Sequence, residues 1–214
     1  MESMVQAQPH SDASPLGQET PPVVLHLRPA IELTEDQFFA LCQQNRDVRI
    51  ERTAEGDIIV MPPTGWRTGA QNARLIAQMN LWADRDRSGV AVDSSTGFTQ
   101  PNGATRSPDV AWVRRTRLAA LTPEQKEKFL PLCPDFVIEL RSPSDPLSVV
   151  QEKMHEYIAN GAQLGWLIDP IEHQVYVYRP GGPVQRLDNP AQLSGEPLLP
   201  GFVLDLAPIW DPDA

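Results

Sequence analysis

The chain has 214 residues, of which 41% are hydrophobic and 21% are charged, a composition typical of a folded domain with a core of its own. Its net charge of −10 argues against broad, sequence-independent binding to nucleic acid, because such binding needs many lysines and arginines against the phosphates, although a local basic groove stays compatible with it. No apolar run approaches the ~20 residues of a membrane span, and the N-terminus lacks the apolar segment of a secretory signal, so we expect a cytoplasmic protein. Cys42 and Cys133 fit that compartment as small buried side chains rather than as a disulfide.

The first half of the chain begins with a polar stretch. Residues 1–22 are rich in proline, serine and glutamine without periodicity, so we predict a disordered tail there and a single folded domain over residues 23–214. TEDQFFALCQQN, residues 34–45, has a capping box and an apolar stripe, which predict a helix. Residues 48–65 alternate around a Glu-Gly pair and predict a hairpin, and residues 66–87 have the apolar spacing of a long amphipathic helix.

The second half mixes strands and helices. Strands joined by turns are predicted over residues 89–113, a short helix in TPEQKEKFL, a strand over 135–141 and a helix from about 146 to 160. QLGWLID and QVYVYRP read as two further strands, and PLLPGFVLDLAPIW is expected to return as an edge. This order predicts an α/β domain with a mixed central sheet flanked by helices.

The strand over residues 135–141 has charges among strong strand formers. Side chains alternate between the two faces, so Phe136 and Ile138 share one face while Glu139 and Arg141 share the other. Burying a carboxylate costs several kcal/mol unless a cation or a metal meets it. The strand is therefore either an edge strand with a solvated outer face or an inner strand whose Glu139 has a partner, and its sequence favours neither alternative.

The following helix offers such a partner. With residues placed 100° apart, Lys153 falls inside the apolar arc between Val149 and Tyr157. One interpretation is that its stem lies along the core and its ammonium reaches solvent. The other follows from the short connection SPSD, which packs the helix back on the strand and allows Lys153 to reach Glu139.

A second carboxylate lies upstream in RSPDVAWV, where Asp109 opens a predicted strand. A Pro-Asp pair is commonly a turn or cap. The alternative is a functional set, in which Asp109 and Glu139 hold a magnesium ion and Lys153 stabilises an attacking water or a charged phosphate.

SPDVAWV, PDFVIELRSPSD, EKMHEYIANGAQLGWLIDP and VYVYRPGG resemble the restriction-endonuclease-like family called Uma-two, of the PD-(D/E)XK nuclease superfamily, over roughly residues 31 to 210. The resemblance implies a restriction-endonuclease-like fold and hydrolysis of phosphodiester bonds with Mg²⁺ or Mn²⁺. Pro108-Asp109 matches the PD pair and Glu139 the acidic member of (D/E)XK, whereas Arg141 stands at the lysine position. The resemblance suggests that the lysine has moved to Lys153.

The resemblance also implies nucleic acid, with DNA as the expected partner, and a homodimer. It matches Glu51 to an auxiliary acid, although an exposed strand glutamate is an equal alternative. We expect a lowered pKa for Lys153 and a role in proton transfer, which a guanidinium such as that of Arg141 cannot perform. Arg141 is left to bind a phosphate or pair with a carboxylate. Further candidate phosphate contacts are Arg67, Arg74, Arg106 and the RRTR run from Arg114 to Arg117, each of which can equally lie on a solvated face. The competing function is a catalytically silent module that binds nucleic acid or protein on the same scaffold.

Overall fold

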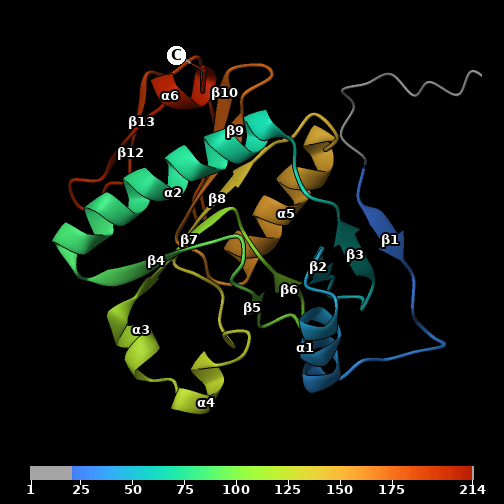
Figure 1. The fold of residues 1–214 in the computed structure, drawn as a ribbon. Helices are drawn as coiled ribbons and strands as arrows, with labels where there is room; N and C mark the ends of the chain where they lie inside the picture. The colour runs from blue at the N-terminus through green and yellow to red at the C-terminus, as the bar shows by residue number, and fades with distance from the viewer. Residues whose placement is uncertain (1–20, 214) are drawn as a thin grey trace, which may run out of the picture.

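The computed structural model describes residues 21–213, and its centre is a six-stranded mixed sheet with the order β11-β10-β9-β8-β7-β4 (Figure 1). The strands are β4 (Gly89–Asp93), β7 (Val110–Arg114), β8 (Phe136–Leu140), β9 (Leu164–Asp169), β10 (Gln174–Tyr178) and β11 (Gln185–Asp188). β8 and β9 run parallel, and the other neighbours are antiparallel. The predicted α/β fold with a mixed central sheet is confirmed.

Strand β8 is an inner strand, between β7 and β9, and all five of its residues are buried. The alternative of an edge strand with a solvated outer face is therefore wrong. Because both neighbours and both faces are covered, Glu139 is only 5% exposed and needs partners inside the protein.

Two helices cover the two faces of this sheet. α2 (Trp66–Asp86) packs its Leu75 and Met79 on the face that carries Phe136 and Ile138. α5 (Leu147–Ala159) packs Val150, Met154 and Tyr157 on the opposite face, around Val137. Both helices were predicted from apolar spacing, and α5 lies on the Glu139 face of β8.

A second sheet has the order β1-β3-β2-β6-β5 and contains the predicted hairpin. Its strands are β1 (Val23–Leu25), β2 (Arg49–Arg52), β3 (Ile58–Met61), β5 (Phe98–Thr99) and β6 (Thr105–Arg106). The predicted capping box is present at Thr34, before α1 (Glu35–Gln44). The short helices α3 (Arg115–Ala119) and α4 (Pro123–Lys126) follow β7, and α4 was predicted while α3 was not.

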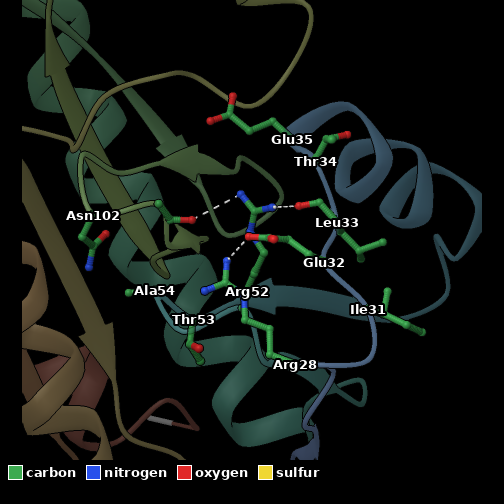
Figure 2. A pocket seen from close by; sticks show the side chains of 12 residues that line it. Arg28, Ile31, Glu32, Leu33, Thr34, Glu35, Arg52, Thr53, Ala54 and Asn102 are labelled. Atoms are coloured by element: carbon green, nitrogen blue, oxygen red, sulfur yellow. Dashed lines mark hydrogen bonds and ion pairs between the residues drawn. The ribbon is translucent and has the colours of Figure 1, made fainter.

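Arg52, the last residue of β2, lines a small cavity of about 280 Å³ beside the second sheet (Figure 2). Its guanidinium donates to the carbonyls of Leu33 and Gly103, at 3.1 and 3.2 Å, and lies over the ring of Phe38. These contacts tie the segment before α1 to the turn between β5 and β6. These contacts give Arg52 a structural role at this cavity.

The C-terminal segment departs from its prediction. β12 (Gln192–Ser194) and β13 (Val203–Asp205) pair with each other in a separate two-stranded sheet, instead of adding an edge to the central one, and α6 (Ala207–Trp210) follows. Phe202 explains the difference, because its ring stacks on Trp166 in the main core at 5.9 Å. The segment therefore packs against the face beside α2 through side chains rather than through backbone pairing.

Three further predictions concern the chain as a whole. The predicted disordered tail falls almost entirely outside residues 21–213. Over that described range, no helix combines the length and the apolar character needed to cross a bilayer. Both cysteines are free thiols; Cys133 is buried as expected, whereas Cys42 is partly exposed.

Candidate active site

A cleft of about 1090 Å³ lies where the β2–β3 hairpin faces the start of β7, the end of β8 and α5. Many charged side chains line it, among them Arg46, Asp47, Asp145 and Glu156. Three carboxylates and three cations form its central cluster: Asp109, Glu139 and Glu51, with Arg49, Arg106 and Lys153. These three carboxylates are only 2–7% exposed, so each needs a compensating partner.

Glu139 is held by two side chains of α5. Lys153 Nζ lies 2.9 Å from Glu139 Oε1, and the hydroxyl of Tyr157 donates to the same oxygen at 2.8 Å. Residues four apart lie on one face of a helix, which is why both reach one carboxylate. Burial raises the pKa of Glu139 to about 7, with Lys153 opposing the shift and Asp109 and Glu51 adding to it.

Glu51 shares the same lysine. Lys153 Nζ lies 2.9 Å from Glu51 Oε1, which also accepts the backbone N–H of Ser107 at 3.0 Å, and Arg106 Nη1 lies 3.3 Å from Oε2. Burial acts to raise the pKa of Glu51, but Lys153, Arg106 and Arg49 outweigh it and lower the pKa to about 2. Glu51 is thus a buried, ionised member of the cluster, and the alternative of an exposed strand glutamate is wrong.

Asp109 lies at the start of β7, beside the end of β8. The backbone N–H of Leu140 donates to its Oδ2 at 2.9 Å, and Asn72 Nδ2 donates to its Oδ1 at 3.4 Å. Arg49 Nη1 also lies 3.3 Å from Oδ1. Leu140 directly follows Glu139 in β8, so this hydrogen bond brings Asp109 close to Glu139. The PD and (D/E)XK pattern implies the same proximity.

Three residues of this site escaped the sequence analysis: Arg49, Asn72 and Tyr157. Arg49 carried a signal, because it lies two residues before Glu51 and therefore points to the same face of its strand. Asn72 contacts Asp109 from α2, 37 residues away in the chain, and no local pattern indicates that contact.

The predicted arginines lie apart from one another. Arg106 is in the cleft but is buried, with Nε 2.6 Å from Glu156 Oε2 and Nη1 near Glu51. Arg141 pairs with the fully buried Asp169 at 2.7 Å, which is one of the two contacts that the sequence left open for it. Arg67 donates to the carbonyl of Trp210. Arg74 is exposed on α2, and neither Arg67 nor Arg74 lines the cleft.

Two arginines of the RRTR run form ion pairs with a buried aspartate of the same chain. Arg114 and Arg117 both pair with Asp135, at 3.7 and 3.1 Å. Asp135 is the first residue of the predicted strand over 135–141, and its carboxylate is buried. The run therefore stabilises the junction of β7 and α3.

The pKa of Lys153 differs from its prediction. Burial acts to lower this pKa, as expected, but the carboxylates of Glu139 and Glu51 outweigh burial and leave the pKa raised. The expected lowering is wrong for the site as described, because the sequence did not show that two carboxylates meet one ammonium.

The carboxylates of the cleft are candidate ligands for a divalent metal. Mg²⁺ is commonly held by one or two carboxylates together with waters and substrate oxygens. The contacts of Glu139 described above all engage Oε1, which leaves Oε2 open, and the buried Asn72 Oδ1 has no hydrogen-bond partner. Over residues 21–213, no group of three or more His, Cys, Asp or Glu could hold a metal ion. The residues fit Mg²⁺ with Asp109 and Glu139 as ligands, provided that water or substrate oxygens complete the shell.

Comparisons with known proteins point to a nuclease family and a nuclease fold. Residues 35–207 match the model of the Uma2 family, described as "Putative restriction endonuclease". One similar solved structure, from Anabaena variabilis, is described as "a putative nuclease belonging to DUF820". It has a TM-score of 0.67 and 22% sequence identity, and the match covers 84% of this chain and 98% of that one. At that identity the likeness shows the fold. No curated protein matches the chain.

Proposed function

The chain belongs to the Uma2 family, and from this premise we propose that it is a metal-dependent endonuclease that hydrolyses phosphodiester bonds of DNA. The observation that carries the proposal is the contact between Lys153 and Glu139 at 2.9 Å, in a cleft that also holds Asp109. These three residue types are the ones that the superfamily pattern requires. Mg²⁺ or Mn²⁺ is the expected cofactor.

Each residue has a role that its contacts support. Asp109 and Glu139 are the proposed ligands, and a bound metal would supply charge stabilisation at the reacting phosphate. Tyr157 and Lys153 fix Glu139 through Oε1, so Oε2 is the oxygen proposed to bind the metal. The positive charge of Lys153, fixed by two carboxylates, is placed to orient an attacking water and stabilise the charge that develops.

Cleavage and metal binding test this proposal together. Asp109→Asn should abolish Mn²⁺ binding in isothermal titration and cleavage of a mixed DNA panel, because it removes a charged ligand. Lys153→Ala should lose most cleavage, at least about a hundredfold if its charge acts on the transition state. It should still bind Mn²⁺ at least as tightly, because a repelling charge has gone.

Lys126→Ala, an exposed lysine on α4, is the matched control and should behave as wild type. Circular dichroism of each variant checks folding. Metal binding that survives in Asp109→Asn would move the ligand elsewhere. A wild-type protein that binds DNA but cleaves none of it with Mg²⁺ or Mn²⁺ would favour the silent binding module.

A further inference from the structure

Arg49 is the most weakly held of the three cations in the central cluster of the cleft. Its Nη1 lies 3.3 Å from Asp109 Oδ1, and its Nη2 lies 3.4 Å from the sulfur of Met61, a weak acceptor. A guanidinium has five N–H donors, so these two contacts leave most of them unused. The side chain is 35% exposed, compared with 10% for Arg106 and 15% for Lys153.

The other two cations are held more firmly. Lys153 lies between Glu51 and Glu139, at 2.9 Å from each. Arg106 lies between Glu51 and Glu156, at 3.3 and 2.6 Å. Each therefore has two carboxylate partners, and moving either would leave buried carboxylates unpaired. Arg49 has one, and β2 presents it at the open side of the cluster.

The proposed ligand set makes Arg49 the cation of the central cluster that a metal would disturb most. A divalent ion on Asp109 and Glu139 would repel Arg49, Arg106 and Lys153, and the described contacts give the latter two cations two carboxylate partners each but give Arg49 one. Arg49 also contacts an oxygen of Asp109, a proposed ligand, so guanidinium and metal compete for that carboxylate. Coulomb repulsion then favours movement of Arg49, the most exposed of these three cations.

Building on the proposed function, we propose that Arg49 is a substrate-binding residue that exchanges partners, from Asp109 in the resting protein to a backbone phosphate of the nucleic acid in the loaded one. A planar guanidinium matches two phosphate oxygens and makes strong charge-assisted hydrogen bonds to them. The exchange relieves the repulsion from the metal and gives the negatively charged substrate a cation inside an acidic protein.

The first test is metal binding without nucleic acid. Isothermal titration with MnCl₂ should show about three- to tenfold tighter binding for Arg49→Ala than for wild type, because the competing charge has gone. Arg49→Lys keeps a charge and should bind Mn²⁺ as wild type does. Arg85→Ala, an exposed arginine of α2 outside the cleft, is the matched control and should change nothing. Equal or weaker Mn²⁺ binding by Arg49→Ala would overturn the proposal, since a purely structural arginine gives that result.

The second test is binding of a labelled DNA duplex by fluorescence anisotropy, with CaCl₂ in place of a catalytic metal. Arg49→Ala should bind about tenfold more weakly, and its slope of log K against log[salt] should be shallower by ~0.9. Arg49→Lys should lie between the two, and it keeps the test valid if Arg49→Ala folds poorly. DNA affinity that equals wild type in both variants would overturn the proposal.

The two tests separate this inference from the proposed function. A wild-type protein that binds Mn²⁺ and cleaves DNA, with Arg49→Ala equal to it in both assays, would remove only the role of Arg49. A wild-type protein that binds no Mn²⁺ and cleaves nothing would remove the proposed function, and the exchange of partners with it.

Discussion

Glu139 and Glu51 are both buried, yet their pKa values move in opposite directions, to about 7 and about 2. Burial acts on both in the same sense, so the difference comes from their neighbours. Glu51 has Lys153, Arg106 and a backbone N–H, whereas Lys153 is the one cation of the described chain that pairs with Glu139. Glu139 is therefore the less neutralised of the two carboxylates, and it is the one that stands to gain from a further cation.

Tyr157→Phe tests how Glu139 is held. The change removes one hydroxyl from a fully buried side chain and leaves its ring in place, so the loss is the hydrogen bond to Glu139 Oε1. We expect the free energy of unfolding to fall by about 1.5–3 kcal/mol, the range for a hydrogen bond to a charged group. Urea denaturation measures this change, and Mn²⁺ titration should show weaker binding because Glu139 is less fixed.

Tyr176→Phe is the matched control for this variant. It removes a hydroxyl that donates to Gln174, two residues away on the partly exposed strand β10. Its effect on the free energy of unfolding should stay below about 0.5 kcal/mol, and its Mn²⁺ affinity should equal wild type. Equal stability of Tyr157→Phe and wild type would show that the Tyr157 hydroxyl does not support Glu139.

At the scale of elements, the pairing of β8 with α5 was largely predictable. The strand alternation placed Glu139 opposite Ile138, and the helical projection placed Lys153 in the apolar arc, so a short connection was enough to suggest that they meet. The contact at 2.9 Å bears out that reasoning. Tyr157 lay at the edge of the same arc. A helical projection gives no distances, so it could not predict that the Tyr157 hydroxyl reaches Glu139.

Other contacts were beyond local patterns. The alternation of β8 put Arg141 on the face of Glu139, yet the strand ends at Leu140 and the chain turns, so Arg141 reaches Asp169 at the end of β9 instead. Arg49 and Asp109 are 60 residues apart, and their contact depends on how the second sheet sits against the central one. Such packing depends on the tertiary fold, so no periodic pattern in the sequence predicts it.

Gly89→Ala tests the packing of β4 against Trp112 in the core below α2. A Cβ at this position would overlap the ring of Trp112, which is buried and lies in the core beneath that helix. Gly89→Ala should therefore lower the free energy of unfolding by about 1–3 kcal/mol, the usual cost of overpacking a core. Urea denaturation monitored by tryptophan fluorescence measures it.

Gly182→Ala supplies the comparison for that variant. It is a glycine of the turn after β10, and a Cβ there would meet nothing within 4 Å. Its stability should match wild type to within about 0.5 kcal/mol. A Gly89→Ala protein as stable as Gly182→Ala would mean that Trp112 moves aside without cost.

At the scale of the whole molecule, a net charge of −10 has to be reconciled with the proposed polyanionic substrate. The positive charges of the cleft are mostly committed to the protein's own carboxylates, as Arg106 and Lys153 are. Arg49 has one weak ion pair, and over residues 21–213 the hydrogen bonds of Arg46 go to Gln43 on its own segment. The cleft can therefore offer about two cations to phosphates, and the proposed metal would supply the rest of the attraction.

This distribution predicts a shallow salt dependence of DNA binding. With about two phosphates neutralised, the slope of log K against log[salt] should be about −2 in CaCl₂, far less steep than that of a protein with a broad basic surface. Fluorescence anisotropy of a labelled duplex over a series of KCl concentrations measures the slope. Arg115→Ala, in the RRTR run on α3 and outside the cleft, should leave it unchanged. A slope of about −5, made shallower by Arg115→Ala, would instead place the DNA on α3 and away from Glu139, and the site in the cleft would lose its substrate.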